Sequence, residues 1–220
     1  MSRIAIVGGH GQVAQHLLAD LRRSGHTPVA LVRREDYRAE LEARGAEVRL
    51  LDIESADAAA FGAAFAHCDA VVFAAGGGAD GSLERKRTVD LEGSLKSIEG
   101  ATLAGISRFV QISAIGVDDA LPDDTSAPWR AYVEAKRDAD TALRASNLRW
   151  TIIRPGKLTD DPATGLVALG PEVSHGEVSR ADVAAVIAAV IDTDESIGAQ
   201  WNLVGGDLAV AAAIATAART

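Results

Sequence analysis

A tyrosine and a lysine, Tyr132 and Lys136, stand four residues apart in the chain. This spacing puts the phenol and the ammonium on one face of a helix, which the apolar periodicity predicts from about Pro128 to Ser146. A free phenol has a pKa near ~10, but a neighbouring ammonium favours the phenolate. Tyr132 is therefore a candidate to exchange a proton with a substrate oxygen, and Ser113 is a candidate to hold that oxygen. The alternative is a buried tyrosine and a surface lysine at accidental spacing.

A glycine-rich turn near the start of the chain is a candidate ligand site. The apolar run Ile4–Val7 leads into three glycines within four residues, and helical spacing of apolar residues follows. Glycine permits positive φ and leaves no Cβ, so N–H groups at the start of the helix can face an anion. The sequence predicts a pyrophosphate site of a dinucleotide here; the alternative is a flexible turn in an ordinary α/β protein. The residues predicted to bind the cofactor at this turn are Gly8, Gly9, His10, Gly11, Gln12 and Val13.

The elements that must position these residues are strands that alternate with helices. Runs of apolar residues of strand length occur at Ile4–Val7, Pro28–Val32, Glu47–Leu51, Ala70–Phe73, Arg108–Ile112, Trp150–Ile153 and Trp201–Val204. Such alternation predicts right-handed crossovers and a mostly parallel sheet covered by helices on both faces. The fold class is therefore α/β, doubly wound. We find no linker or repeat, and expect one domain over residues 1–220 with the substrate pocket built in part from 154–220.

Glycines and reactive polar residues directly follow the predicted strands. Because parallel strands end at one edge of a sheet, where ligands bind, we expect these residues to lie close together. They are Gly8–Gly11, Arg33-Arg34, Asp52-Ile53, Ala74-Ala75-Gly76, Ser113, and Pro155-Gly156. We predict that all of them except Ser113 contribute to cofactor binding.

The arginines after the second strand bear on the choice of cofactor. A carboxylate at this place usually accepts hydrogen bonds from the ribose of NAD, whereas an arginine pairs with the extra phosphate of NADP. Arg33 therefore favours NADP, and NAD remains an alternative. The competing interpretation is a solvated basic pair partnered by Glu35 and Asp36. Asp52 can accept a hydrogen bond from the adenine amino group or cap the segment after it.

The bulk composition excludes several classes of function. A net charge of −9 argues against a nucleic-acid surface, and Cys68 is the only cysteine, so we expect neither a disulfide nor a cysteine-based metal site. We see no signal-type segment and no run of membrane-spanning length, and expect a cytoplasmic protein with no membrane partner. The segment Leu208 to Ala218 is expected to form a terminal helix.

Several motifs together resemble the short-chain dehydrogenase/reductase superfamily, in particular its atypical single-domain branch of flavin- and biliverdin-reductase-like and epimerase-related proteins. They are Gly8 to Ala14, Val89 to Gly93, Arg108 to Ser113, Tyr132 to Lys136, Arg154-Pro155-Gly156 and Ser179 to Ala184. The resemblance implies a Rossmann fold that binds NADP, a small-molecule substrate, and allows a homo-oligomer. It also implies that Ser113, Tyr132 and Lys136 form the catalytic triad, with Lys136 holding the nicotinamide ribose.

The chain departs from this family at two points. Many relatives carry an asparagine where Asp90 aligns, and because few residues follow the sixth predicted strand we do not expect the longer C-terminal substrate domain of the sugar epimerases. A small carbonyl compound, a quinone or a flavin therefore fits better than a nucleotide sugar. We expect specificity to depend on the loops 77–83, 116–128 and 157–176.

Residues within two of these loops have alternative interpretations. The acidic loop 116–128 is either a lid or a solvated connection, and the connection is preferred because charge runs usually face water. Lys157 and His175 are either substrate contacts or ordinary surface residues.

These residues support three functional hypotheses. The leading one is an oxidoreductase that uses NADPH to reduce a small carbonyl compound, with Tyr132 as general acid/base. The second is an NAD(P)H-dependent reductase of flavin or quinone, for which a proton donor is less needed. The third is a non-catalytic regulatory protein that senses NADP, because fold alone does not imply catalysis.

Overall fold

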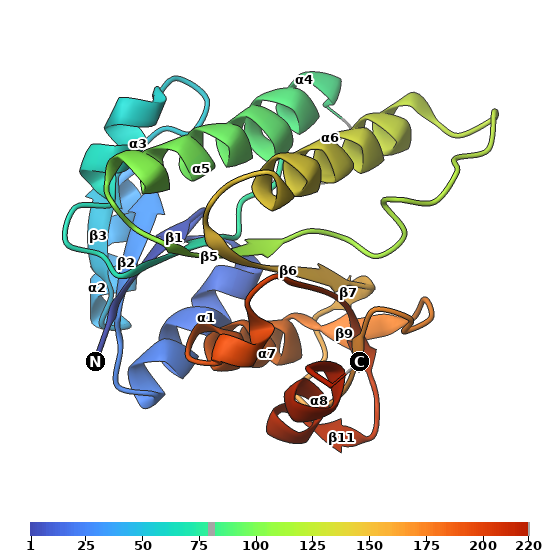
Figure 1. Cartoon of the computed structure of the whole chain (residues 1–220). Helices are drawn as coiled ribbons and strands as arrows, with labels where there is room; N and C mark the ends of the chain where they lie inside the picture. Colours follow the sequence, from blue (N-terminus) through green and yellow to red (C-terminus); the bar gives the residue numbers. More distant parts are fainter. Residues whose placement is uncertain (79–81, 220) are drawn as a thin grey trace.

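The computed structural model describes residues 1–78 and 82–219, which form one central sheet between two layers of helices (Figure 1). The strand order in the sheet is β11-β8-β10-β6-β5-β4-β1-β2-β3. The strands are β1 (Arg3–Val7), β2 (Thr27–Val32), β3 (Glu47–Leu50), β4 (Ala70–Phe73), β5 (Arg108–Ile112), β6 (Arg149–Pro155), β8 (Leu166–Gly170), β10 (Ala199–Gly205) and β11 (Leu208–Ala209). Two further short strands, β7 (Lys157–Thr159) and β9 (Glu177–Ser179), pair with each other outside it.

The strands β1 to β6 and β10 run parallel, and β8 runs antiparallel to both of its neighbours, β10 and β11. All seven predicted strands are present, and the expected mostly parallel Rossmann-like sheet is confirmed. Residue 4 pairs with residue 28 of β2 on one side and with residue 70 of β4 on the other, so β1 is an interior strand, third from the β3 end of the sheet. The glycine turn therefore leaves the sheet between β4 and β2.

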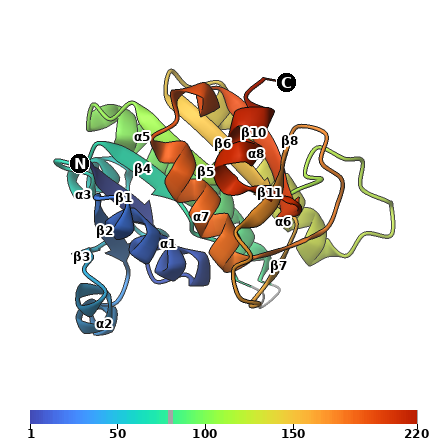
Figure 2. The same ribbon diagram turned by 90° about the horizontal axis from the view of Figure 1, so that it is seen from below.

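Helices cover both faces of the sheet (Figures 1 and 2). On one face lie α3 (Ala58–Ala64), α4 (Leu83–Arg85), the π-helical segment η2 (Lys86–Glu92), α5 (Gly93–Leu103) and α6 (Ala127–Arg144). On the other lie α1 (Gln12–Arg23), α7 (Arg180–Ile191) and α8 (Val210–Ala217). The remaining helical segments are η1 (Glu35–Tyr37), α2 (Arg38–Ala43) and η3 (Asp194–Ser196).

The alternation of side chains along β1 explains the two layers. Ile4 and Ile6 face the core shared with α1 and α7, whereas Ala5 and Val7 face the core shared with α3 and α5. Helix α1 buries Leu17 through its apolar stripe, and α7 is apolar nearly all round because it lies between the sheet, α1 and α8. Every central strand is therefore buried on both sides, as a parallel sheet requires.

The structure corrects the predicted C-terminal part of the chain. The segment Leu208 to Ala218 is not one helix: Leu208 and Ala209 form strand β11, and α8 begins at Val210. The strands β7, β8 and β9 were not predicted. They are three to five residues long, and their conformation depends on pairing with distant strands rather than on a local pattern.

Cys68 is a free, buried thiol just before β4. Within residues 1–78 and 82–219, no helix has both the length and the apolar composition that a membrane span needs.

Candidate functional site

The glycine turn joins β1 to α1 and leaves the helix start open. Gly8 has φ +81°, and a Cβ there would lie 2.8 Å from the backbone of Ala75, so no other residue fits without strain. Gly11 is the N-cap residue of α1, and it has no side chain that could accept a hydrogen bond from the first turn of the helix. Because N–H groups of a first helical turn have no partner within the helix, they are available to an anion at this place.

Gly9 has a different role from the other glycines of the turn. Its N–H donates to the carbonyl of Leu31 at 3.0 Å, and a Cβ would lie 2.6 Å from the Cβ of Ala30. The residue therefore lets the end of β1 approach β2, and it does not line the adjacent cavity. Its predicted direct contact with a cofactor stays a prediction.

A cavity of about 280 Å³ opens beside this turn, at the carboxyl ends of β1 to β4. Its lining includes the predicted cofactor residues Gly8, His10, Gly11, Arg33, Asp52, Ile53, Ala74, Ala75 and Gly76. It also includes residues that the sequence analysis missed: Leu31, Val32, Tyr37, Leu51, Glu54, Arg85 and Val89. Apolar walls, an open helix start and a basic side chain fit the adenosine and phosphate part of a nicotinamide dinucleotide.

The two arginines after β2 are placed differently. Arg33 lines the cavity and lies 3.9 Å from Glu54. Arg34 does not line it; its guanidinium lies 2.8 Å from Asp36 and over the ring of Tyr37. Of the predicted pair, only Arg33 is in position to meet a ligand in the cavity, whereas Arg34 matches the solvated interpretation.

Two further contacts shape the wall of the cavity. The rings of His10 and Tyr37 stack with centroids 3.7 Å apart and planes 7° apart. Asp52 accepts a hydrogen bond from the N–H of Glu54 at 3.1 Å, so it caps the local turn while also lining the cavity. Tyr37 had no recognisable signal in the sequence, because its place depends on the short helix η1.

Helix α6 presents Tyr132 and Lys136 together, as their spacing predicts. Lys136 is buried, and its Nζ lies 6.0 Å from the centre of the Tyr132 ring. The same Nζ donates to the carbonyl of Ile112 at 3.2 Å and lies 3.2 Å from Oδ1 of Asp90. The predicted surface lysine is therefore excluded: this ammonium is held inside the protein between α6, β5 and η2.

Burial and charge both act on the phenol. Burial raises the pKa of Tyr132, Lys136 opposes this, and the carboxylates of Asp90 and Asp140 raise it again. Burial alone would lower the pKa of Lys136, but attraction to Asp90 and Tyr132 outweighs it and the pKa is raised. At neutral pH the site therefore contains a neutral phenol and a charged ammonium.

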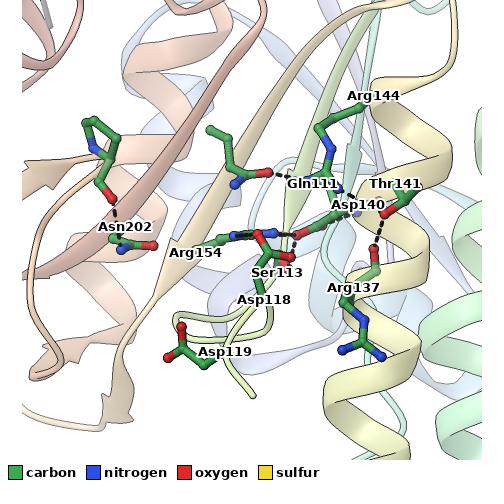
Figure 3. A network of polar contacts seen from close by, with 12 residues as sticks. Gln111, Ser113, Asp118, Asp119, Arg137, Asp140, Thr141, Arg144, Arg154 and Asn202 are labelled. Atoms are coloured by element: carbon green, nitrogen blue, oxygen red, sulfur yellow. Dashed lines mark hydrogen bonds and ion pairs between the residues drawn. The ribbon is translucent and has the colours of Figure 1, made fainter. Parts of the chain in front are cut away.

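Ser113 lies at the end of β5 in a buried polar network centred on Asp140 (Figure 3). Its hydroxyl donates to Oδ2 of Asp140 at 2.7 Å. The side chains of Gln111 and Arg154 also donate to Asp140, at 2.7 and 2.9 Å. In this arrangement the hydroxyl proton of Ser113 points to Asp140, and the oxygen can still accept a hydrogen bond. The predicted role of Ser113 in holding a substrate oxygen stays a prediction.

Some predicted cofactor residues lie outside the cavity lining: Gln12, Val13, Lys136, Pro155 and Gly156, besides Gly9 and Arg34. Gly156 is required for packing, since a Cβ there would clash with the carbonyl oxygen of Gly176. Their predicted contacts with a cofactor stay predictions.

The predicted specificity loops differ in how their polar residues are engaged. Residues 79–81 of the first loop lie outside the described residues. In the acidic loop 116–128, Arg154 donates to Asp118 at 2.6 Å, and the rest extends away from the sheet in Figure 1, as a solvated connection would. Lys157 pairs with Glu177 at 2.6 Å on the surface, and His175 lies 3.5 Å from Asp119.

Comparison with known proteins agrees with this architecture. The chain is 36% identical over 213 residues to a Bacillus subtilis protein named uncharacterized sugar epimerase YhfK, covering 96% of this chain and 98% of that one. A Bacillus halodurans structure, provisionally named an NAD-dependent epimerase/dehydratase, has a TM-score of 0.91 at 39% identity and covers 98% and 100% of the two chains. The structure of ChuY, an anaerobillin reductase from Escherichia coli O157:H7, has a TM-score of 0.76 at 27% identity and covers 94% and 98%.

The family assignment rests on most of the chain. Residues 8–194, from the glycine turn through α7 into η3, match the family described as NAD(P)H-binding. The relatives carry names of epimerases and reductases, and the fold is that of the oxidoreductase-like Rossmann proteins. The protein is thus a member of the NAD(P)H-binding family, within the atypical branch of the short-chain dehydrogenases/reductases.

Proposed function

We propose that the protein is an NADPH-dependent oxidoreductase that reduces a small carbonyl compound, with Tyr132 as the proton donor. The observation that carries the proposal is the buried Lys136 ammonium, which lies 6.0 Å from the centre of the Tyr132 ring. Helix α6, which carries both residues, packs against η2, and Val89 of η2 lines the cavity at the glycine turn. When bound, NADPH would supply a hydride, which is two electrons and one proton, to the carbonyl carbon. The carbonyl becomes an alcohol once a second proton reaches its oxygen.

The chain's own residues handle that proton. Tyr132 is neutral because its pKa is raised, and it donates its proton to the substrate oxygen. Lys136 stabilises the phenolate that remains until solvent returns the proton. Ser113 donates its hydroxyl proton to Asp140, so in this proposal it does not supply the proton that reaches the substrate oxygen.

Arg33 supports the preference for NADPH, and its replacement tests it. Arg33→Ala should weaken NADP binding about tenfold or more, because one charge-assisted hydrogen bond to the ribose phosphate is lost, and should leave NAD binding nearly unchanged. Arg34→Ala is the matched control, since Arg34 lies outside the cavity lining. Both affinities can be measured by titration calorimetry; equal losses for NADP and NAD would contradict the assigned contact.

A second function is favoured by one observation beside the tyrosine. Trp129 is exposed on the first turn of α6, and its ring lies 5.3 Å from that of Tyr132. Such a pair can stack against a planar conjugated acceptor, which supports the alternative of a flavin or quinone reductase. A conjugated acceptor needs the phenol proton less than a simple carbonyl does.

The experiment that tests the proposal is a substrate panel. Aldehydes, ketones, quinones and flavins are each mixed with the protein and NADPH, and the loss of NADPH absorbance is followed. We expect oxidation with at least one aldehyde or ketone. Turnover only with quinones or flavins would replace the first function by the second. No turnover with any acceptor, while NADPH raises the melting temperature, would point to a sensor and overturn both.

A further inference from the structure

The carboxylate of Asp90 lies between the loop after β4, the segment η2 and helix α6. Asp90 is fully buried on η2, its Oδ2 accepts the N–H of Gly77 at 2.8 Å, and its Oδ1 lies 3.2 Å from Nζ of Lys136. The backbone at Gly77 packs closely against the carboxylate, because a Cβ there would lie 2.9 Å from Oδ2. The carboxylate is therefore fixed by the backbone and does not depend on the lysine for its position.

This placement changes what Lys136 does to the phenol. An isolated ammonium favours a nearby phenolate, but an ammonium paired with a carboxylate at 3.2 Å acts as a dipole, whose field falls off faster. An asparagine here would keep the contact to Gly77 without cancelling the positive charge.

Two other charged groups face Tyr132. From α6, Asp140 faces it and is compensated by Arg154 at 2.8 Å. From η2, Lys86 lies 5.4 Å from the ring centre and donates to the carbonyl of Gly78, a neutral partner that does not cancel its charge. Lys86 stays the same when Asp90 is replaced, so a change in the phenol on that replacement reports the pair of Asp90 and Lys136.

We infer that Asp90 is a positioning residue that offsets the charge of Lys136 and so keeps Tyr132 in its protonated form, the form that can donate a proton to a substrate oxygen. The inference rests on the proposed function, in which Tyr132 donates the proton. The raised pKa of Tyr132 agrees with it.

The protonation of Tyr132 can be measured directly. It contains only two tyrosines, so in a Tyr37→Phe background the ultraviolet absorbance of phenolate reports Tyr132 alone. In that background, Asp90→Asn should lower the midpoint of the Tyr132 titration by about one pH unit, because the Lys136 charge is no longer cancelled. Glu92→Gln is the matched control: it removes a charge from the same segment η2, where Glu92 pairs with Arg87, and should leave the midpoint unchanged.

A second variant covers the case in which Asp90→Asn does not fold with a buried, unpaired ammonium. Asp90→Asn/Lys136→Met removes both charges, and if the pair is neutral toward the phenol its midpoint should match that of the background protein. Circular dichroism at each pH confirms that the protein remains folded. An unchanged midpoint in Asp90→Asn, or a rise of about one unit in the double variant, would overturn the role of Asp90.

The titration uses neither substrate nor cofactor, so it separates the two proposals. If Asp90→Asn shifts the midpoint but Tyr132→Phe retains carbonyl turnover, the proposed function is wrong and the electrostatic coupling is right. If turnover depends on Tyr132 but the midpoint does not depend on Asp90, the opposite holds.

Discussion

Tyr132→Phe should remove most of the NADPH-dependent reduction of a carbonyl substrate, lowering kcat by about 10²- to 10⁴-fold, the usual contribution of a general acid. The substitution deletes only the hydroxyl and keeps the ring beside Trp129. Because Tyr132 does not line the cavity at the glycine turn, the dissociation constant of NADPH should stay nearly the same. Steady-state kinetics and NADPH fluorescence titration measure the two quantities.

The other tyrosine provides the control. Tyr37→Phe keeps the ring that stacks on His10 and lies in the cavity wall, so kcat should hardly change. Full carbonyl turnover in Tyr132→Phe would falsify the role of Tyr132 as proton donor. Retained turnover with a quinone or flavin, together with loss for carbonyls, would show that the acceptor decides whether the proton is needed.

Asp140→Ala should lower the free energy of unfolding by about 3–5 kcal/mol, the usual cost of removing one partner from a buried ion pair. Asp140 is fully buried and accepts from Ser113, Gln111 and Arg154. After its removal, the buried Arg154 keeps only Asp118 as a carboxylate partner among the described residues. Urea denaturation followed by circular dichroism measures the loss.

Asp138→Ala is the matched control for this prediction. Asp138 is on the same helix, its side chain is 60% exposed, and its nearest cation, Arg137, is 4.0 Å away. Its replacement should change stability by less than about 0.5 kcal/mol, as for most surface positions. If the two variants lose the same stability, the network around Asp140 does not hold α6 to β5 and β6.

The parts of the fold that could be predicted from the sequence are those set by local pattern. Strands such as Ile4–Val7 are short apolar runs bounded by turn residues, and their alternation with helices leaves few topologies. The contact between Tyr132 and Lys136 was predictable because spacing of four is a property of the helix itself. The convergence of residues at one sheet edge followed from parallel strands.

The parts that could not be predicted depend on contacts between distant residues. Asp140 meets Ser113 and Arg154 only through the packing of α6 on β5 and β6, and it lies on no motif. The sequence pattern alone does not distinguish the roles of Gly9 and Gly11. In the structure Gly9 packs against Ala30, whereas Gly11 is the N-cap residue of α1. Arg33 and Arg34 are neighbours, and only the turn of the chain decides which reaches the cavity.

The assignment of residues 154–220 to the substrate pocket stays a prediction. The structure gives this stretch the strands β7 to β11 and the helices α7 and α8, at the end of the sheet away from β3. The Arg154 side chain extends from it into the network at Asp140.

The position of Asp90 depends on the number of residues in the π-helical segment η2 as well as on their types. A π-turn contains one residue more than an α-turn, and here it carries Asp90 toward Lys136. Deleting one residue would remove the extra residue of the wide turn and let the helix close with α-helical geometry. Asp90 would then lose the place from which it meets both Gly77 and Lys136. Insertions and deletions should therefore be selected against here more strongly than conservative substitutions, so that lineages preserve the residue count of this helix.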